Sequence, residues 1–342
     1  MSLRTRGALA LACTTFLAAC ASGPGVDTAA VRQVPRFAPL PEGWEHGAFM
    51  EVFVRAYQDS DGDGIGDLRG LTQRLDYLQA LGIRGLWLMP ITASADHDHG
   101  YAVTDYRAIE PAYGTLADFD ELVRQAHARG IGIVMDYVVN HSSDKSPLFV
   151  QSASSPTNPW RQWYVWENKD PTGWSIFEHD PWTTTPNGAY FAQFGPDMPD
   201  FNLRNPAVVA YHLDSLRFWL NHGADGFRID AVGHLFENGA QGWSLQPENY
   251  PFMGQLRAAI DIDHPHVVVC ESPGDPIGFA APTACGSAFA FGHSDALVKA
   301  ARGDTQAMRD VVDYFATAPA GMATMVSNHD SFAGHRLWDA MR

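Results

Sequence analysis

The chain has 342 residues, of which 46% are hydrophobic, 18% are charged and 12% are aromatic. This composition provides enough apolar material for one large domain or two ordinary ones. The formal net charge of -16 at pH 7 argues against nucleic acid as a partner and fits a protein that acts on neutral ligands.

The N-terminus has the pattern of a secretory signal. Arg4 and Arg6 precede a short apolar run, and Leu-Ala-Ala-Cys follows at residues 17–20. We therefore expect a signal peptide over residues 1–19, which is too short to span a membrane. Its last residues resemble a bacterial lipobox. This implies export and a lipid anchor on Cys20, at the periplasmic face or the cell surface of a bacterium; the alternative is an ordinary signal peptide with a chance cysteine.

Residues 20–46 carry Ala, Ser, Gly and Pro without periodicity, which predicts a tether between the anchor and the folded domain. Beyond the leader only two cysteines remain, Cys270 and Cys285. They could form a disulfide in an oxidising compartment. Because Cys270 lies in an apolar run, however, we expect a buried free thiol.

An alternation of strands and helices begins after residue 47. Apolar runs predict seven strands, at residues 49–54, 83–90, 131–136, 226–230, 266–270, 288–291 and 322–327. Helical spacing predicts helices at residues 68–81, 116–128, 207–221, 251–260, 296–302 and 306–315. Near-continuous apolar strands alternating with helices indicate a parallel sheet covered by helices. Polar residues collect just after the strands, as in a (β/α)8 barrel. An open doubly wound sheet is the alternative, but no Gly-x-Gly-x-x-Gly turn follows the first strand.

Residues 141–200 interrupt this alternation. They are rich in Trp, Pro, Thr and Asn and show no clear helix. Since structureless stretches of this length are rare inside a domain, we expect a small inserted subdomain after the third strand. The barrel would then comprise residues 47–140 and 201–342.

A loop at residues 59–67 places carboxylates at alternate positions with glycines between them. Oxygen ligands on a flexible loop suit Ca²⁺, although an EF-hand would require Glu where this chain has Gly70. We therefore expect a different calcium loop, and the alternative is an acidic turn in which Asp67 caps a helix. The expected ligands are Asp59, Asp61, Asp63, the carbonyl of Ile65 and Asp67.

Further polar residues follow the predicted strands. The segment 96–101, Asp-His-Asp-His-Gly-Tyr, could bind a transition metal, but a polar loop at the active face is the favoured interpretation.

Arg228 and Asp230 lie two residues apart on one strand and so point to the same side. A guanidinium lowers the pKa of a neighbouring carboxyl, which makes Asp230 a candidate nucleophile or half of a structural ion pair. Glu271 ends an apolar strand, where burial would raise its pKa and suit a general acid.

Asp136 to His141 end the third predicted strand, and Asn328-His329-Asp330 end the seventh. Together with residues 226–234 and Glu271, these segments occur in the order and spacing of the α-amylase family of glycoside hydrolases. The family's lesser motifs are matched at residues 82–90, 99–101 and 198–202. The resemblance runs from about residue 47 to 335. The motifs are most similar to the group between the oligo-1,6-glucosidase and neopullulanase types.

The resemblance implies a (β/α)8 barrel with residues 141–200 as domain B, and a retaining hydrolase of α-glucosidic bonds. Asp230 would be the nucleophile, Glu271 the acid/base and Asp330 the residue that stabilises the distorted sugar. The implied substrate-binding residues are Asp98, Tyr101, His141, Arg228, His234 and His329. Retention requires one ionised and one protonated carboxyl group. We expect Arg228 to keep Asp230 charged and burial to keep Glu271 protonated.

Departures from the family pattern refine this expectation. Ala231 after the nucleophile resembles members that cleave α-1,4 bonds, which implies oligosaccharides derived from maltodextrin or starch. Ala102 and Gly233 replace residues that often support the site.

We recognise no eighth strand and no C-terminal β-sandwich, which predicts a truncated barrel. A transglycosylating relative similar to sucrose or maltose isomerases, and a non-catalytic glycan-binding homologue or inactive fragment, remain alternatives. We expect a monomer without an organic cofactor.

Overall fold

A computed structural model describes residues 25–34, 40–95, 99–332 and 335–336. The expected signal peptide and Cys20 lie outside the described residues, so export and lipid anchoring stay predictions. Among the described helices, none combines the length and apolarity needed to cross a membrane.

The core of the fold is a sheet of seven strands in the order β1-β2-β5-β9-β10-β11-β12. Every neighbouring pair in this sheet is parallel. The strands are β1 (Ala48–Val52), β2 (Ile83–Leu88), β5 (Gly132–Tyr137), β9 (Gly226–Ile229), β10 (Val267–Cys270), β11 (Ala288–Phe289) and β12 (Met322–Ala323). The expected fold class, a parallel α/β barrel sheet, is confirmed, and all seven strands lie where the apolar runs predicted them.

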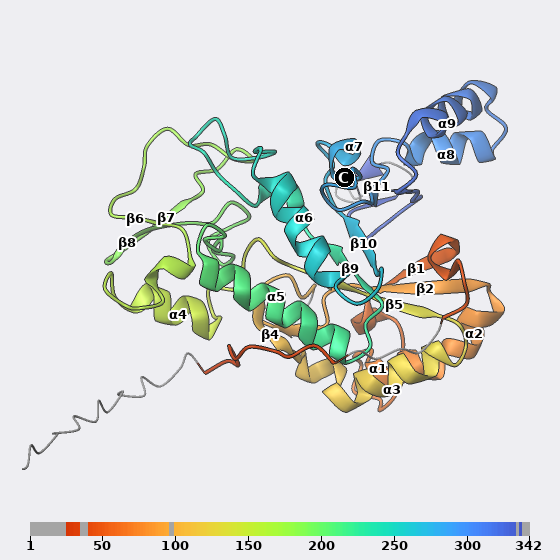
Figure 1. Cartoon of the computed structure of the whole chain (residues 1–342), viewed down its shortest axis with the longest axis horizontal. Helices are drawn as coiled ribbons and strands as arrows, with labels where there is room; N and C mark the ends of the chain where they lie inside the picture. The colour runs from red at the N-terminus through yellow and green to blue at the C-terminus, as the bar shows by residue number, and fades with distance from the viewer. Residues whose placement is uncertain (1–24, 35–39, 96–98, 333–334, 337–342) are drawn as a thin grey trace, which may run out of the picture.

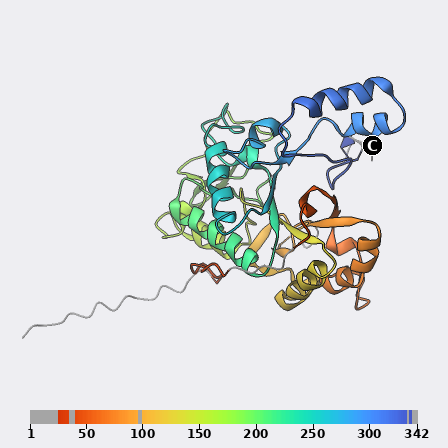
Figure 2. The ribbon, with the colours of Figure 1, turned by 45° about the vertical axis from the view of Figure 1, so that its right-hand side comes forward.

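Helices connect successive strands, and most of them lie along one face of this sheet, whereas the last two pack mainly on each other (Figure 1). They are α1 (Leu68–Gln73), α2 (Leu75–Ala80), α3 (Leu116–His127), α5 (Pro206–Asn221), α6 (Asn249–Ile260), α7 (Pro276–Phe279), α8 (Ser294–Ala301) and α9 (Thr305–Thr317). Residues 68–81 were expected as one helix, but the chain divides into α1 and α2 at Arg74, which caps both. Helix α3 begins with a capping box between Thr115 and Asp118. In both views α8 and α9 form a pair at the edge farthest from the inserted sheet (Figure 2).

The segment between β5 and α5 forms a separate layer beside the main sheet (Figure 1). It contains a three-stranded antiparallel sheet in the order β6-β8-β7, from β6 (Trp166–Glu167), β7 (Trp182–Thr185) and β8 (Gly188–Phe191). It also contains α4 (Pro147–Ser154), a helix that the sequence did not indicate. His141 and Asp200 face each other in an antiparallel bridge at the base of the insertion. A second small sheet, β3 (Thr92–Ser94) with β4 (Val103–Ile109), precedes α3.

The part of the expected tether at residues 25–34 lies against the barrel. The Val34 N–H donates to Asn221 Oδ1 at 2.7 Å, and Arg107 Nη1 donates to the Ala29 carbonyl at 2.7 Å. Arg107 is almost fully buried, and its guanidinium also lies 3.5 Å from Asp27. These residues are therefore bound along the end of α5 rather than extended into solvent.

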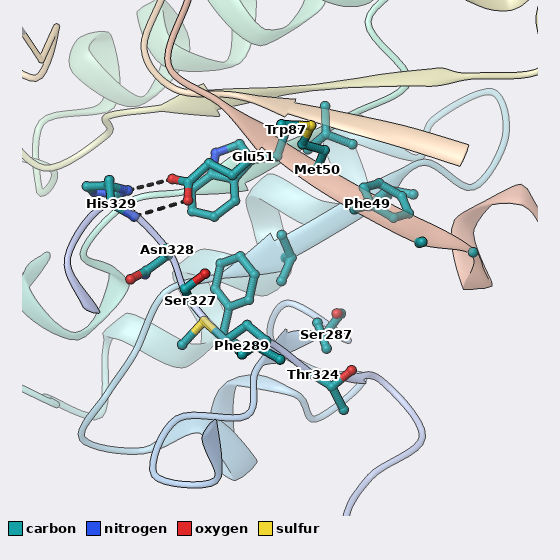
Figure 3. A pocket seen from close by; sticks show the side chains of 18 of the residues that line it. Phe49, Met50, Glu51, Trp87, Ser287, Phe289, Thr324, Ser327, Asn328 and His329 are labelled. Carbon is teal, nitrogen blue, oxygen red and sulfur yellow. Dashed lines mark hydrogen bonds and ion pairs between the residues drawn. The ribbon is translucent and has the colours of Figure 1, made fainter. Parts of the chain in front are cut away.

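The sheet is open between its first and last strands. Within the described residues β1 pairs only with β2, and β12 pairs only with β11. A cavity of about 1160 Å³ lies in this space, with Phe49, Met50 and Glu51 of β1 on one side and Phe289 on the other (Figure 3). It extends to Asn328 and His329, which follow β12. A short hairpin of β13 (Ser331–Phe332) and β14 (His335–Arg336) comes next in the chain.

The expectation of a buried free thiol at Cys270 is wrong. Cys270 and Cys285 form a disulfide, and both residues are fully buried. The sequence showed the apolar strand around Cys270 but not the path of the following segment. That segment folds through α7 and returns Cys285 beneath the end of β10, where the Cys285 N–H donates to Phe279.

Candidate active site

The guanidinium of Arg228 lies at the centre of a group of carboxylates at the carboxyl ends of β5, β9 and β10. Nη1 lies 2.9 Å from both carboxylate oxygens of Asp136 and 2.6 Å from Asp230 Oδ1. Nη2 lies 2.8 Å from Glu271 Oε2. The Arg228 side chain is 1% exposed, so these are charge-assisted contacts in a poorly solvated environment. The sequence predicted that Asp230 and Glu271 would converge, and the structure brings them to one cation.

Strand register produces this arrangement. Asp136 on β5 lies opposite Arg228 on β9, and Ile229 lies opposite Cys270 on β10. The chain turns sharply after Asp230 because Ala231 adopts a left-handed conformation with φ 47°. This uncommon conformation for a non-glycine residue directs the Ala231 N–H to Glu271 Oε2 at 3.0 Å. The turn therefore links the ends of β9 and β10.

The protonation states in this structure differ from those expected. Burial, together with repulsion from Glu271 and Asp136, raises the pKa of Asp230 well above its usual value, although Arg228 acts in the opposite direction. Burial also opposes ionisation of Glu271, but Arg228 and the Ala231 N–H outweigh it and lower the pKa of Glu271. These pKa directions are opposite to those expected from the sequence. The physical reason is that Glu271 has its own guanidinium nitrogen and an amide donor, whereas Asp230 shares Nη1 with Asp136.

A second set of contacts joins this group to β1. The Tyr101 hydroxyl donates to Asp136 Oδ2 at 3.1 Å and lies 3.0 Å from Nε2 of His329. The other ring nitrogen of His329, Nδ1, lies 2.6 Å from Glu51 Oε1, and the His329 N–H donates to Glu51 Oε2 (Figure 3). The structure thus brings Tyr101 and His329 to the site as predicted.

Sequence reasoning missed Glu51 as an anchor of the site, and it placed Asp136 at a strand end without identifying Arg228 as its partner. Glu51 orients His329, and Asp136 receives hydrogen bonds from Arg228, Tyr101 and the indole Nε1 of Trp87 at 3.2 Å. A signal for Glu51 existed, because it is a charged residue within the apolar run of β1. Its partner is separated by 278 residues, and no local pattern reveals such a contact.

Asp330 lies apart from the Arg228 group. Its side chain is 55% exposed, and its carboxylate lies 3.8 Å from Nε2 of His329. The Asp330 N–H donates to Asn328 Oδ1 at 3.1 Å. The structure therefore places Asp330 beside His329, at the opening of the site, and shows no contact between it and Arg228.

His141 and His234 lie on the side of the inserted subdomain. Burial, with a smaller effect of His234, lowers the pKa of His141 to about 3, so its ring is neutral. His141 Nε2 is buried without a hydrogen-bond partner. His234 Nδ1 lies 3.1 Å from Gln193 Oε1, and its ring stacks on Trp243. Asp98, predicted to bind substrate, lies outside the described residues.

The acidic loop gathers three of its four predicted carboxylates. Oxygens of Asp59, Asp61 and Asp67 all lie within 4.8 Å of one another. Asp63 is not in this group, and its carboxylate accepts the Ile65 N–H at 2.7 Å. Asp67 also caps α1 by accepting from the Gly70 N–H. The structure shows the capping role of Asp67, and calcium binding stays a prediction.

The family model described as "Alpha amylase, catalytic domain" matches residues 51–335. The chain belongs to the α-amylase family. Alpha-amylase 3 of Dictyoglomus thermophilum is 44% identical over 217 residues, which cover 63% of this chain and 42% of that protein. The trehalose synthase/amylase TreS of Mycolicibacterium smegmatis is 42% identical over 257 residues, covering 71% of this chain and 43% of that protein.

Other relatives fit the same assignment. The oligo-1,6-glucosidase of Parageobacillus thermoglucosidasius is 34% identical over 254 residues, which cover 68% of this chain and 45% of that enzyme. The crystal structure of an alpha-amylase from H. orenii superposes with a TM-score of 0.72 at 33% identity, covering 83% of this chain and 61% of that one. The chain spans less than half the length of each of these three curated relatives.

The contact between Glu51 and His329 predicts a pH-dependent effect. Burial lowers the pKa of His329, but the Glu51 carboxylate outweighs burial and raises it above the usual value. A raised histidine pKa contributes stability below about pH 6.5, and this contribution is lost as the pH rises through the folded-state pKa. Glu51→Gln should therefore lower the pKa of His329 and destabilise the protein more at pH 6 than at pH 9.

The pKa can be measured by NMR titration of the imidazole protons, and stability by urea unfolding at both pH values. Asp330→Asn is the matched control, because Asp330 lies farther from His329 and is half exposed. It should lower the pKa of His329 by less than Glu51→Gln does. Equal effects of the two variants would contradict the role given to Glu51.

Proposed function

We propose that this chain carries the active site of a retaining hydrolase of α-glucosidic bonds, mainly α-1,4, in maltodextrin-like oligosaccharides. The observation that carries the proposal is the convergence of Asp136, Asp230 and Glu271 on the buried guanidinium of Arg228. Two carboxyl groups with opposite pKa shifts on strand ends are suited to acid/base and nucleophilic chemistry. Membership of the α-amylase family supports the substrate class.

In the proposed first step, Asp230 attacks the anomeric carbon and the bond to the glycosidic oxygen breaks. Glu271 donates its proton to the departing oxygen, and a glycosyl ester remains on Asp230. In the second step, Glu271 accepts a proton from water while the water oxygen attacks the anomeric carbon. This releases the sugar with its original configuration and restores both carboxyl groups.

The reaction requires the proton on Glu271, whereas the structure favours it on Asp230. Both carboxyl groups contact the same guanidinium, so they lie close enough for a bound sugar or a water to carry the proton between them. A sugar bound against Asp230 would bring the glycosidic oxygen to Glu271 as a proton acceptor. Asp330, at the opening of the site, would bind the hydroxyl groups of the distorted sugar. His141, with its unpartnered and buried Nε2, is placed to donate to a sugar oxygen.

Glucosyl transfer to another sugar is a second candidate function. It shares the first step, and an acceptor hydroxyl replaces water in the second. The similarity to a trehalose synthase/amylase and to an α-glucosyl transfer enzyme, XgtA, favours it. A non-catalytic glycan-binding role is the third, and the presence of all three carboxyl groups argues against it.

We also propose a structural Ca²⁺ in the loop at residues 59–67. Three carboxylates with oxygens within 4.8 Å of one another are a donor set that suits this cation. Asp59 is held by the N–H groups of Gly62 and Gly64, which lower its pKa, so it is ionised and fixed. The ion would connect the loop after β1 to the start of α1.

Asp230→Asn removes the proposed nucleophile without a large change in shape. Hydrolysis of an aryl α-maltoside should fall by about 10⁴-fold or more, as expected for removal of a covalent catalyst. Asp170→Asn, an exposed carboxylate of the inserted subdomain, is the control and should retain normal turnover. Chromatography of the products separates hydrolysis, which yields shorter sugars, from transfer, which yields new glucosides. Normal turnover by Asp230→Asn would refute the mechanism, and maltooligosaccharide binding without turnover by the wild type would favour the non-catalytic role.

Calcium should raise the thermal midpoint of the wild-type protein, because a ligand that binds only the folded state stabilises it. Asp61→Asn should abolish this shift, whereas Asp63→Asn should retain most of it, since Asp63 lies outside the carboxylate group. The shift is measured by calorimetry with Ca²⁺ or with a chelator. No shift in the wild type, or an equal loss in both variants, would contradict the proposed ligand set.

A further inference from the structure

A group of two histidines and one aspartate lies at the opposite end of the sheet from Arg228. Asp263, His264 and His266 belong to the turn between α6 and β10, and each offers a ligand atom within 4.8 Å of the others. The two imidazole rings lie 4.0 Å apart between centroids, and His264 Nδ1 lies 3.3 Å from Asp263 Oδ1. No motif or spacing in the sequence indicated this group.

A small cavity adjoins this group. It measures about 40 Å³ and is lined by Asp263, His264 and His266, together with His127, Asp225 and Gln33. A cavity needs about 10–15 Å³ of this kind of volume to hold one water, so there is room for a coordinated ion with its remaining water ligands.

Two polar atoms at this cavity lack hydrogen-bond partners. His266 Nδ1 is buried without one, and the side chain is only 6% exposed. The closest recorded charge to this nitrogen is Asp261 Oδ1 at 3.9 Å, beyond hydrogen-bond distance. Gln33 Oε1 is also buried without a partner. Buried polar atoms without partners are costly, and a bound ion is one means of satisfying them.

We propose that Asp263, His264 and His266 bind a divalent transition metal ion such as Zn²⁺, with the side-chain oxygen of Gln33 or a water as fourth ligand. Imidazole nitrogens with a carboxylate suit Zn²⁺, whereas Ca²⁺ and Mg²⁺ prefer oxygen ligands alone.

The surrounding residues fit a supporting layer around this ion. His127 Nε2 lies 2.7 Å from Asp225 Oδ2, and the same oxygen accepts the Ile133 N–H at 2.7 Å. His127 Nε2 and Asp225 Oδ2 are already hydrogen-bonded to each other. The two residues would therefore influence the ion by their electrostatic field and would not be ligands. Because Gln33 belongs to residues 25–34, the ion would also fasten this N-terminal segment to the base of the barrel.

The site is structural in this proposal. It lies where β5, β9 and β10 begin, and the Arg228 group lies where they end. Features at the amino-terminal face of such barrels serve stability, whereas chemistry occurs at the other face. Loss of the metal should therefore lower thermal stability, and the outcome is independent of the proposed hydrolysis.

The test is equilibrium dialysis of the purified full chain against ZnCl₂, with excess Ca²⁺ present to saturate the acidic loop. The wild type should bind one equivalent of Zn²⁺ and show a higher thermal midpoint. His266→Ala and His264→Ala should each weaken binding by at least about tenfold and lose the thermal shift. His46→Ala, whose side chain is 84% exposed and does not belong to this group, should bind Zn²⁺ as the wild type does.

His264 is about one-third exposed, so His264→Ala should fold even if His266→Ala does not. Circular dichroism verifies folding before each titration. Failure of the wild type to bind Zn²⁺ would overturn the proposal. Wild-type affinity in a folded His264→Ala variant would overturn it as well, because binding would then come from other surface residues.

Discussion

The site depends on one buried cation shared by three carboxyl groups. Arg228 is almost without solvent contact, and Asp136, Asp230 and Glu271 all lie within 2.9 Å of its guanidinium nitrogens. A single positive charge cannot stabilise three negative charges in a poorly solvated environment, so one carboxyl group retains a proton. The pKa of Asp230 is raised and that of Glu271 is lowered because the two buried carboxyl groups share this single positive charge. This constraint leaves one protonated and one ionised carboxyl group at the site, although the proposed hydrolysis requires the proton on Glu271.

The positions of the carboxyl groups could be predicted from the sequence because they depend on local patterns. Each follows an apolar run, and the carboxyl ends of parallel strands meet at one edge of the sheet. The strand register then places Asp136 opposite Arg228 without further information. The barrel sheet was predictable for the same reason, since the apolar runs are short, numerous and separated by helical spacing.

Features that depend on distant contacts could not be predicted. The lowered pKa of Glu271 depends on Nη2 of Arg228 and on the turn at Ala231. No sequence motif indicated the left-handed backbone of this turn. The Cys270–Cys285 disulfide depends on the return of the chain through α7. Glu51 reaches His329 across 278 residues. In each case the residue is visible in the sequence, but its partner is identified only by the three-dimensional structure.

The central claim is that Asp230 forms a covalent bond to the sugar and that Glu271 acts as acid and base. The most direct measurement is intact-protein mass spectrometry of Glu271→Gln treated with α-glucosyl fluoride. Fluoride leaves without a general acid, whereas removal of the sugar from Asp230 needs the missing base. The account predicts an added mass of one glucosyl unit, located by peptide mapping to the residue at 230. No adduct, or an adduct on another carboxyl group, would contradict it.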